Sequence, residues 1–143
     1  MLSDNDFIKQ LENCTLPADQ FDHVGHLRIA WLYLRELEIK DAITKTANSI
    51  QNYASSLGAP KKFHYTLTVV SLFILKERMM SDPAGKFETF LENQPDLRSH
   101  FKDLVHAHYS QERLSDSRAQ ESYIEPDLKD FFEPFSGPDD PLS

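Results

Sequence analysis

The stretch "FDHVGHLRIAWLYLRE", Phe21–Glu36, decides the fold class of this chain. Its apolar residues recur at intervals of three and four, which is the spacing of an amphipathic α-helix. On a helical wheel of about 100° per residue, Leu27 and Leu34 fall within about 40° of His23, and His26 falls about 60° to the other side. The stretch therefore predicts a helix whose two histidines lie on or beside its buried stripe, at the N-terminal end.

Helical periodicity continues along most of the chain. We expect six helices, over Asp4–Asn13, Asp22–Leu37, Asp41–Leu57, Lys62–Met80, Pro83–Glu92 and 96–109, and a further short helix over 115–123 stays open. The fold class is therefore all-α, as a single-domain bundle of five to six helices over residues 1–123. Residues 124–143 hold four of the eight prolines together with Phe131, Phe132 and Phe135. We expect them to form an extended, Pro-rich, acidic C-terminal tail that packs on the domain or trails from it.

The composition limits the compartment and the kinds of site. Of the 143 residues, 40% are hydrophobic and 27% charged, which is enough for a core without cross-links. Cys14 is the only cysteine, so the chain has no disulfide framework and cannot build a thiolate zinc site alone. The longest apolar stretch, Leu67–Leu75, is too short to cross a bilayer, and no signal peptide is recognisable. We therefore expect a cytoplasmic protein.

The charge distribution argues against two classes of partner. The formal net charge is −8, and residues from Ser115 onward carry 8 acids and 2 bases, against 15 and 13 before them. No stripe of Lys and Arg with interleaved aromatic residues is present, so we expect no nucleic-acid binding. The acidic tail also argues against an anionic membrane surface. A small molecule or a second copy of the chain stays open as a partner.

A second helix carries polar residues on one face. In "KKFHYTLTVVSLFIL", residues 61–75, Thr68 and Ser71 fall within about 40° of His64 on the helical wheel. Buried polar groups need partners, so this face is unusual for a core helix. Short connections make sequential helices antiparallel, which would bring the N-termini of the two histidine-bearing helices to one end of the bundle. His23, His26 and His64 would then converge there.

Three converging imidazoles favour a metal site as the first hypothesis. A helix N-terminus disfavours protonated histidine, and neutral imidazole is the form that binds a metal. We expect His23, His26 and His64 to hold one divalent transition metal, with zinc or iron first, and to leave a position open for water or a substrate. Such a site would give a metal-dependent enzyme of unknown reaction. Four further residues are expected to line the pocket: Tyr65, Thr68, Ser71 and His108.

Other interpretations of the same residues stay open. An H-x-x-H pair is weak evidence on its own, because the zinc pattern H-E-x-x-H is absent. The histidines could instead bond to backbone or carboxylate groups at the edge of the core. The hydroxyls of Thr68 and Ser71 could bond to the preceding helical turn. As functions, the alternatives are a metal-free small-molecule site, in which His64 or His23 acts as a general base, and a protein-interaction module.

Four stretches resemble one family: "FDHVGHLRIAW" (21–31), "KKFHYTLT" (61–68), "HYSQERLSDSRAQ" (108–120) and "YIEPDL" (123–128). They are similar to an uncharacterised family of small bacterial all-helical proteins with the patterns F-x-H-x-x-H-L-R-x-A-W and K-[YF]-H-x-T. The resemblance implies that His23, His26 and His64 belong to one recurring constellation. The family pattern has an acid after the third histidine, whereas this chain has Tyr65. The resemblance brings no assigned reaction.

Overall fold

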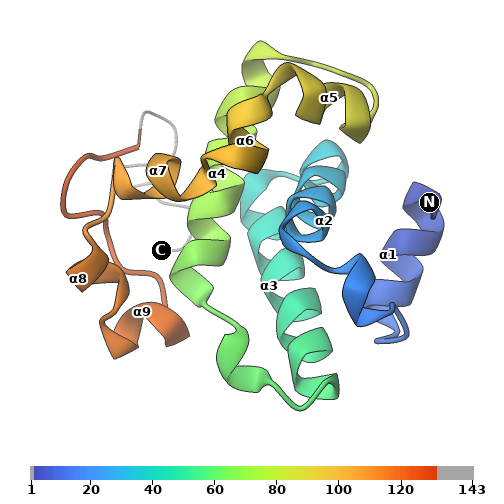
Figure 1. The fold of residues 1–143 in the computed structure, drawn as a ribbon, viewed down its shortest axis with the longest axis horizontal. Helices are drawn as coiled ribbons and strands as arrows, with labels where there is room; N and C mark the ends of the chain where they lie inside the picture. Colours follow the sequence, from blue (N-terminus) through green and yellow to red (C-terminus); the bar gives the residue numbers. More distant parts are fainter. Residues whose placement is uncertain (1, 132–143) are drawn as a thin grey trace.

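The computed structural model describes residues 2–131, and within them every regular element is helical. Nine α-helices and two short 3₁₀ helices follow one another without a β-strand in this part of the chain (Figure 1). The α-helices are α1 (Asp4–Glu12), α2 (His23–Glu36), α3 (Ile39–Ser56), α4 (Tyr65–Ser81), α5 (Phe87–Asn93), α6 (Pro95–Ser99), α7 (Phe101–His106), α8 (Gln111–Leu114) and α9 (Ser117–Glu121). The 3₁₀ helices are η1 (Ala18–Gln20) and η2 (Pro60–Lys62). The predicted all-α class is therefore confirmed.

The three helices α2, α3 and α4 form the centre of the core. Each packs against the other two. Trp31 of α2, Ile43 of α3 and Phe73 of α4 are all almost completely buried. Helices α2 and α4 run in the same direction and α3 runs antiparallel to them, as short connections predict (Figure 1). The N-termini of α2 and α4 therefore lie at the same end of the bundle.

Local sequence explains where the long helices begin and end. The hydroxyl of Ser3 accepts a hydrogen bond from the backbone N–H of Asp6 (3.2 Å), which caps α1. The carboxylate of Asp22 accepts one from the N–H of Gly25 (2.9 Å), which caps α2. Helix α3 stops before Gly58, which has φ of +75°, a conformation that glycine adopts without steric cost.

After α4, the helices differ in number and boundaries from those that the sequence predicted. The helix predicted over 96–109 is interrupted at His100 (φ −134°, ψ 31°), which separates α6 from α7. The helix expected from Pro83 begins only at Phe87. Periodicity did not reveal either break, because His100 has an ordinary helix propensity and Pro83 suits a first helical turn equally well. Residues 2–131 therefore hold nine α-helices, where the sequence predicted five or six.

After α9 the chain has no helix up to residue 131. The ring of Phe131 is buried and packs against Phe73 and His108, with ring centroids 5.1 and 4.0 Å apart. The rest of the predicted tail, 132–143, lies outside the described residues. Within residues 2–131, no helix has both the length and the apolar character needed to cross a bilayer.

Candidate functional site

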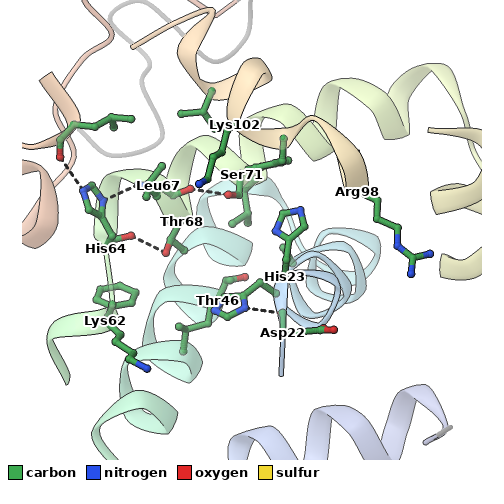
Figure 2. A pocket seen from close by; sticks show the side chains of 18 of the residues that line it. Asp22, His23, Thr46, Lys62, His64, Leu67, Thr68, Ser71, Arg98 and Lys102 are labelled. Atoms are coloured by element: carbon green, nitrogen blue, oxygen red, sulfur yellow. Dashed lines mark hydrogen bonds between the residues drawn. The ribbon is translucent and has the colours of Figure 1, made fainter. Parts of the chain in front are cut away.

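A cavity of about 990 Å³ opens where the N-terminal ends of α2 and α4 face the α6–α8 segment (Figure 2). Its titratable lining residues are Asp22, His23, His26, Lys62, His64, Arg98, His100, Lys102, Asp103 and His106. Its apolar lining residues are Phe21, Ala30, Ile50, Phe63, Leu67, Leu72, Phe101, Val105 and Leu114. The three predicted histidines, His23, His26 and His64, therefore do converge on one cavity.

His23 connects α2 to the segment between α6 and α7. Its Nε2 lies 2.9 Å from the backbone oxygen of Leu97, and its ring lies 5.0 Å from the ring of Phe101. A carbonyl oxygen can only accept, so Nε2 carries the hydrogen and donates it. In the neutral ring, Nδ1 then keeps a lone pair that a ligand can use.

His26 is held one turn further along α2. Its Nδ1–H donates to the backbone oxygen of Asp22 (2.9 Å), and its ring stacks on Phe21 at 4.1 Å. His26 is exposed at the cavity, but the protein around its ring still removes enough solvation to lower its pKa below the ordinary value, and the nearby His23 adds to the effect. The imidazole is therefore neutral near pH 7, with the lone pair on Nε2.

Gly25 allows the close approach that positions His26. A Cβ atom on this residue would lie 2.9 Å from the backbone oxygen of Gln20 and 3.2 Å from the ring of Phe21. Both distances are too short for an ordinary contact, so only glycine lets the segment before α2 pack this tightly. The sequence H-V-G-H thus places a stacking ring beside the second histidine.

His64 has no free ring nitrogen. The backbone N–H of Leu67 donates to its Nδ1 (3.1 Å), so the imidazole is the N-cap of α4. Its Nε2–H donates to the backbone oxygen of Leu114, also at 3.1 Å. One neutral tautomer satisfies both bonds and leaves no lone pair for a metal or for proton abstraction.

The structure does not arrange His23, His26 and His64 as the ligands of one metal ion. Among residues 2–131, no group of three or more His, Cys, Asp or Glu side chains is placed to hold a metal ion. His64 would have to give up its cap on α4 or its bond to Leu114 before it could bind one. The expectation of zinc or iron stays a prediction, to be tested by metal analysis.

The other predicted pocket residues divide into two groups. Thr68 and Ser71 line the cavity, and both hydroxyls donate to the preceding turn, to the backbone oxygens of His64 (2.9 Å) and Leu67 (2.7 Å). Their oxygens therefore face the cavity as acceptors. Tyr65 does not line the cavity, and its ring lies edge-on to Phe63 with centroids 6.3 Å apart.

His108 is not among the residues that line this cavity, so its predicted place in a pocket stays a prediction. Its Nδ1–H donates to the backbone oxygen of Lys129 (2.7 Å), and its ring stacks on Phe131. The break at His100 explains the difference, because the helical register that pointed His108 inward does not continue through it. The bond ties the chain after α9 to the end of α7.

Thr46 is a cavity residue that the sequence did not reveal. Its side chain is 1% exposed, and within the described residues its hydroxyl has no hydrogen-bond partner. It lies on α3, and Figure 2 shows it between Lys62 and His23. A buried hydroxyl without a partner is costly, so a ligand or water that bonded to it would be favoured. No periodicity or motif distinguishes this threonine from its neighbours in "AITKTANS".

Three basic side chains at the cavity were also missed. Lys62, Arg98 and Lys102 all line it and are exposed. Within residues 2–131, the four ion pairs of the protein involve other cations: Arg28, Lys45, Arg78 and Arg118. The sequence did not predict this cluster of cations, because the three residues are far apart in a chain whose overall charge is negative.

Comparison with known proteins adds no relative. No family model matches the chain, and neither a curated protein nor a solved structure shows significant similarity to it. The resemblance to small bacterial helical proteins therefore stays a prediction.

Proposed function

We propose that this protein binds a small organic molecule, without a metal, in the cavity between α2, α4 and α7. The observation that carries the proposal is the buried hydroxyl of Thr46, which has no partner within residues 2–131, in a cavity that also holds two histidines, each with a ring nitrogen that no residue of that range occupies. These groups offer one donor and two acceptors to a ligand. Pockets for small molecules combine such a few polar groups with an apolar lining.

The same geometry selects His26 as the general base if the ligand is a substrate. A base must be unprotonated near the working pH and must have a nitrogen that can accept a proton. His26 meets both conditions, because its pKa is lowered and its Nδ1–H bond to Asp22 leaves Nε2 free. His64, one of the bases expected from the sequence, has both nitrogens engaged.

Thr46→Val tests the proposal with two opposite readouts. In the free protein, valine has nearly the same shape and removes an unsatisfied hydroxyl, so the melting temperature should rise. Ligand binding should weaken, because the donor is gone. Ser49→Val on the same helix is the control, because its hydroxyl is bonded to Tyr33, and its melting temperature should fall.

Binding itself is measured with a library of polar fragments by NMR, in chelator-treated protein. Fragments that occupy the cavity should shift the ring signals of His23 and His26 and leave those of His108 unchanged. Loss of these shifts in Thr46→Val would support the proposal. If no fragment moves the ring signals of His23 or His26, or if Thr46→Val binds as well as the wild type, the proposal is wrong.

The location and the oligomeric state are separate proposals. The single cysteine, Cys14, is free, which suits the reducing cytoplasm. Localisation of the tagged full-length chain tests this compartment. Sedimentation at several protein concentrations tests whether the chain forms a homo-oligomer.

A further inference from the structure

The cavity concentrates positive charge in a protein that is negative overall. Lys62, Arg98 and Lys102 line it, although the chain carries a formal net charge of −8. Within residues 2–131, none of the three has an ion pair or a side-chain hydrogen bond. Unpaired cations around a concave surface raise the local concentration of anions.

The two acids of the lining oppose this field only in part. The carboxylate of Asp22 is engaged by the N–H of Gly25, and in Figure 2 it points away from Thr68 and His64. Asp103 is exposed beside Lys102 and offsets one of the three cations. The helices α2 and α4, 14 and 17 residues long, also begin at this cavity, and a helix N-terminus carries partial positive charge.

Much of the remaining lining is apolar, so the cavity favours a ligand that has an apolar part as well as a charge. Leu67, Phe101 and Leu114 lie in the wall beside Lys102 and Ser71. Figure 2 shows the side chain of Lys102 running from α7 towards Ser71, whereas Arg98 extends away from His23. An inorganic anion alone would leave this apolar surface uncovered. A molecule with one acidic end and one apolar body would satisfy both parts.

We propose that the ligand of this cavity is an amphiphilic organic anion, with its acid group near Lys102 and its apolar body against Leu67 and Phe101. Thr46 supplies the second polar contact, because its buried hydroxyl has no other partner within the described residues. This inference rests on the proposed small-molecule function and narrows it to one class of ligand. The acid group is a carboxylate or a phosphate monoester, since both pair with ammonium groups.

Four probes of one chain length test the inference by calorimetry on the full-length protein. They are octanoate, octyl phosphate, neutral octanamide and octylammonium. Both anions should bind at least about fivefold more tightly than octanamide, which corresponds to one partly screened ion pair. Octylammonium should bind least. Raising the salt concentration should narrow the difference between octanoate and octanamide, because it screens exposed charges.

Lys102→Gln locates the charge and Lys86→Gln is its matched control. Both variants remove one positive charge, but Lys86 lies outside the cavity lining. The affinity for octanoate should fall about fivefold in Lys102→Gln and stay unchanged in Lys86→Gln. Octanamide should bind both variants as it binds the wild type. Circular dichroism of the two variants checks that each is folded.

The outcomes separate this inference from the function on which it rests. Equal binding of octanoate and octanamide, with shifts at the ring of His26, overturns the preference for anions and leaves the small-molecule site standing. The preference for anions is also overturned if octylammonium binds more tightly than octanoate. The same holds if Lys86→Gln and Lys102→Gln lose affinity for octanoate equally. If no probe binds, the inference is wrong, and the fragment screen decides independently whether the cavity binds small molecules. The ratio between octyl phosphate and octanoate shows which acid group is preferred.

Discussion

The two halves of this molecule are held together by different kinds of contact. Helices α2, α3 and α4 pack against one another and bury most of their apolar side chains, among them Trp31, Ile43 and Phe73. The segment from α6 to residue 131 consists of helices of four to six residues, which are too short to be stable alone.

Leu97, Tyr109 and Phe131 bury this second half against the core, and side chains that donate to backbone oxygens add specific links to it. His23 reaches Leu97, His64 reaches Leu114 and Thr66 reaches Ser122. In return, Gln120 donates to the oxygens of Lys61 and Phe63. The cavity lies between the halves, so the histidines that line it also join them. The comparison teaches that polar residues on a core helix can serve as anchors for chain that cannot fold by itself.

Removing a central apolar side chain should have the largest effect. Phe73 is 0% exposed and packs on both Tyr123 and Phe131. Phe73→Ala should lower the free energy of unfolding by about 3–5 kcal/mol, since it removes burial and leaves a void. Urea denaturation measures the change. Leu57→Ala, at a side chain that is 53% exposed, should cost far less. Equal losses would contradict the assignment of the core to α2–α4.

Thr66→Val should loosen the second half selectively. The buried hydroxyl of Thr66 donates to the oxygen of Ser122 (2.8 Å) and accepts from the N–H of Ile124 (3.3 Å). Valine has similar volume but leaves both backbone groups without this partner, which costs about 1–3 kcal/mol. Amide exchange should accelerate in α9 and residues 122–124 and stay slow in α2 and α3. Uniform acceleration throughout the chain would show that the halves do not separate.

Two substitutions at His64 should separate its two bonds. His64→Asn keeps a side-chain acceptor for the N–H of Leu67, whereas His64→Ala removes the cap. Both lose the bond to Leu114. The free energy of unfolding of His64→Ala should therefore be lower than that of His64→Asn by about 1 kcal/mol, as for other N-caps. The difference in urea midpoints measures this, and equal stability of the two variants would argue against a capping imidazole.

The smallest expected effect is the pH dependence from His26. Its folded-state pKa is lower than its ordinary value of 6.5, so the unfolded chain takes up the proton first. This contribution to stability is complete above pH 6.5 and is lost as the pH falls through 6.5 towards the folded-state pKa. His26→Gln should show a shallower loss of stability between pH 7 and pH 5 than the wild type. If stability falls equally with pH in the wild type and in His26→Gln, the pKa of His26 is not lowered.

Sequence patterns predicted the long helices and part of the site. The helix boundaries depend on local interactions, such as the caps formed by Ser3 and Asp22 and the positive φ of Gly58. The convergence of His23 and His26 with His64 followed from helical periodicity and short connections. Their bonds did not follow, because the partners of His23 and His64 lie 74 and 50 residues away in the sequence.

The amino-acid sequence by itself determined the all-helical class, the direction of the first helices and the end of the bundle at which the histidines meet. These depend on spacing within one helix or on short connections. Only the tertiary structure decided which ring nitrogens and which hydroxyl, that of Thr46, lack a partner among residues 2–131, and that Lys62, Arg98 and Lys102 line one cavity. These depend on contacts between segments far apart in the chain, for which periodicity carries no information.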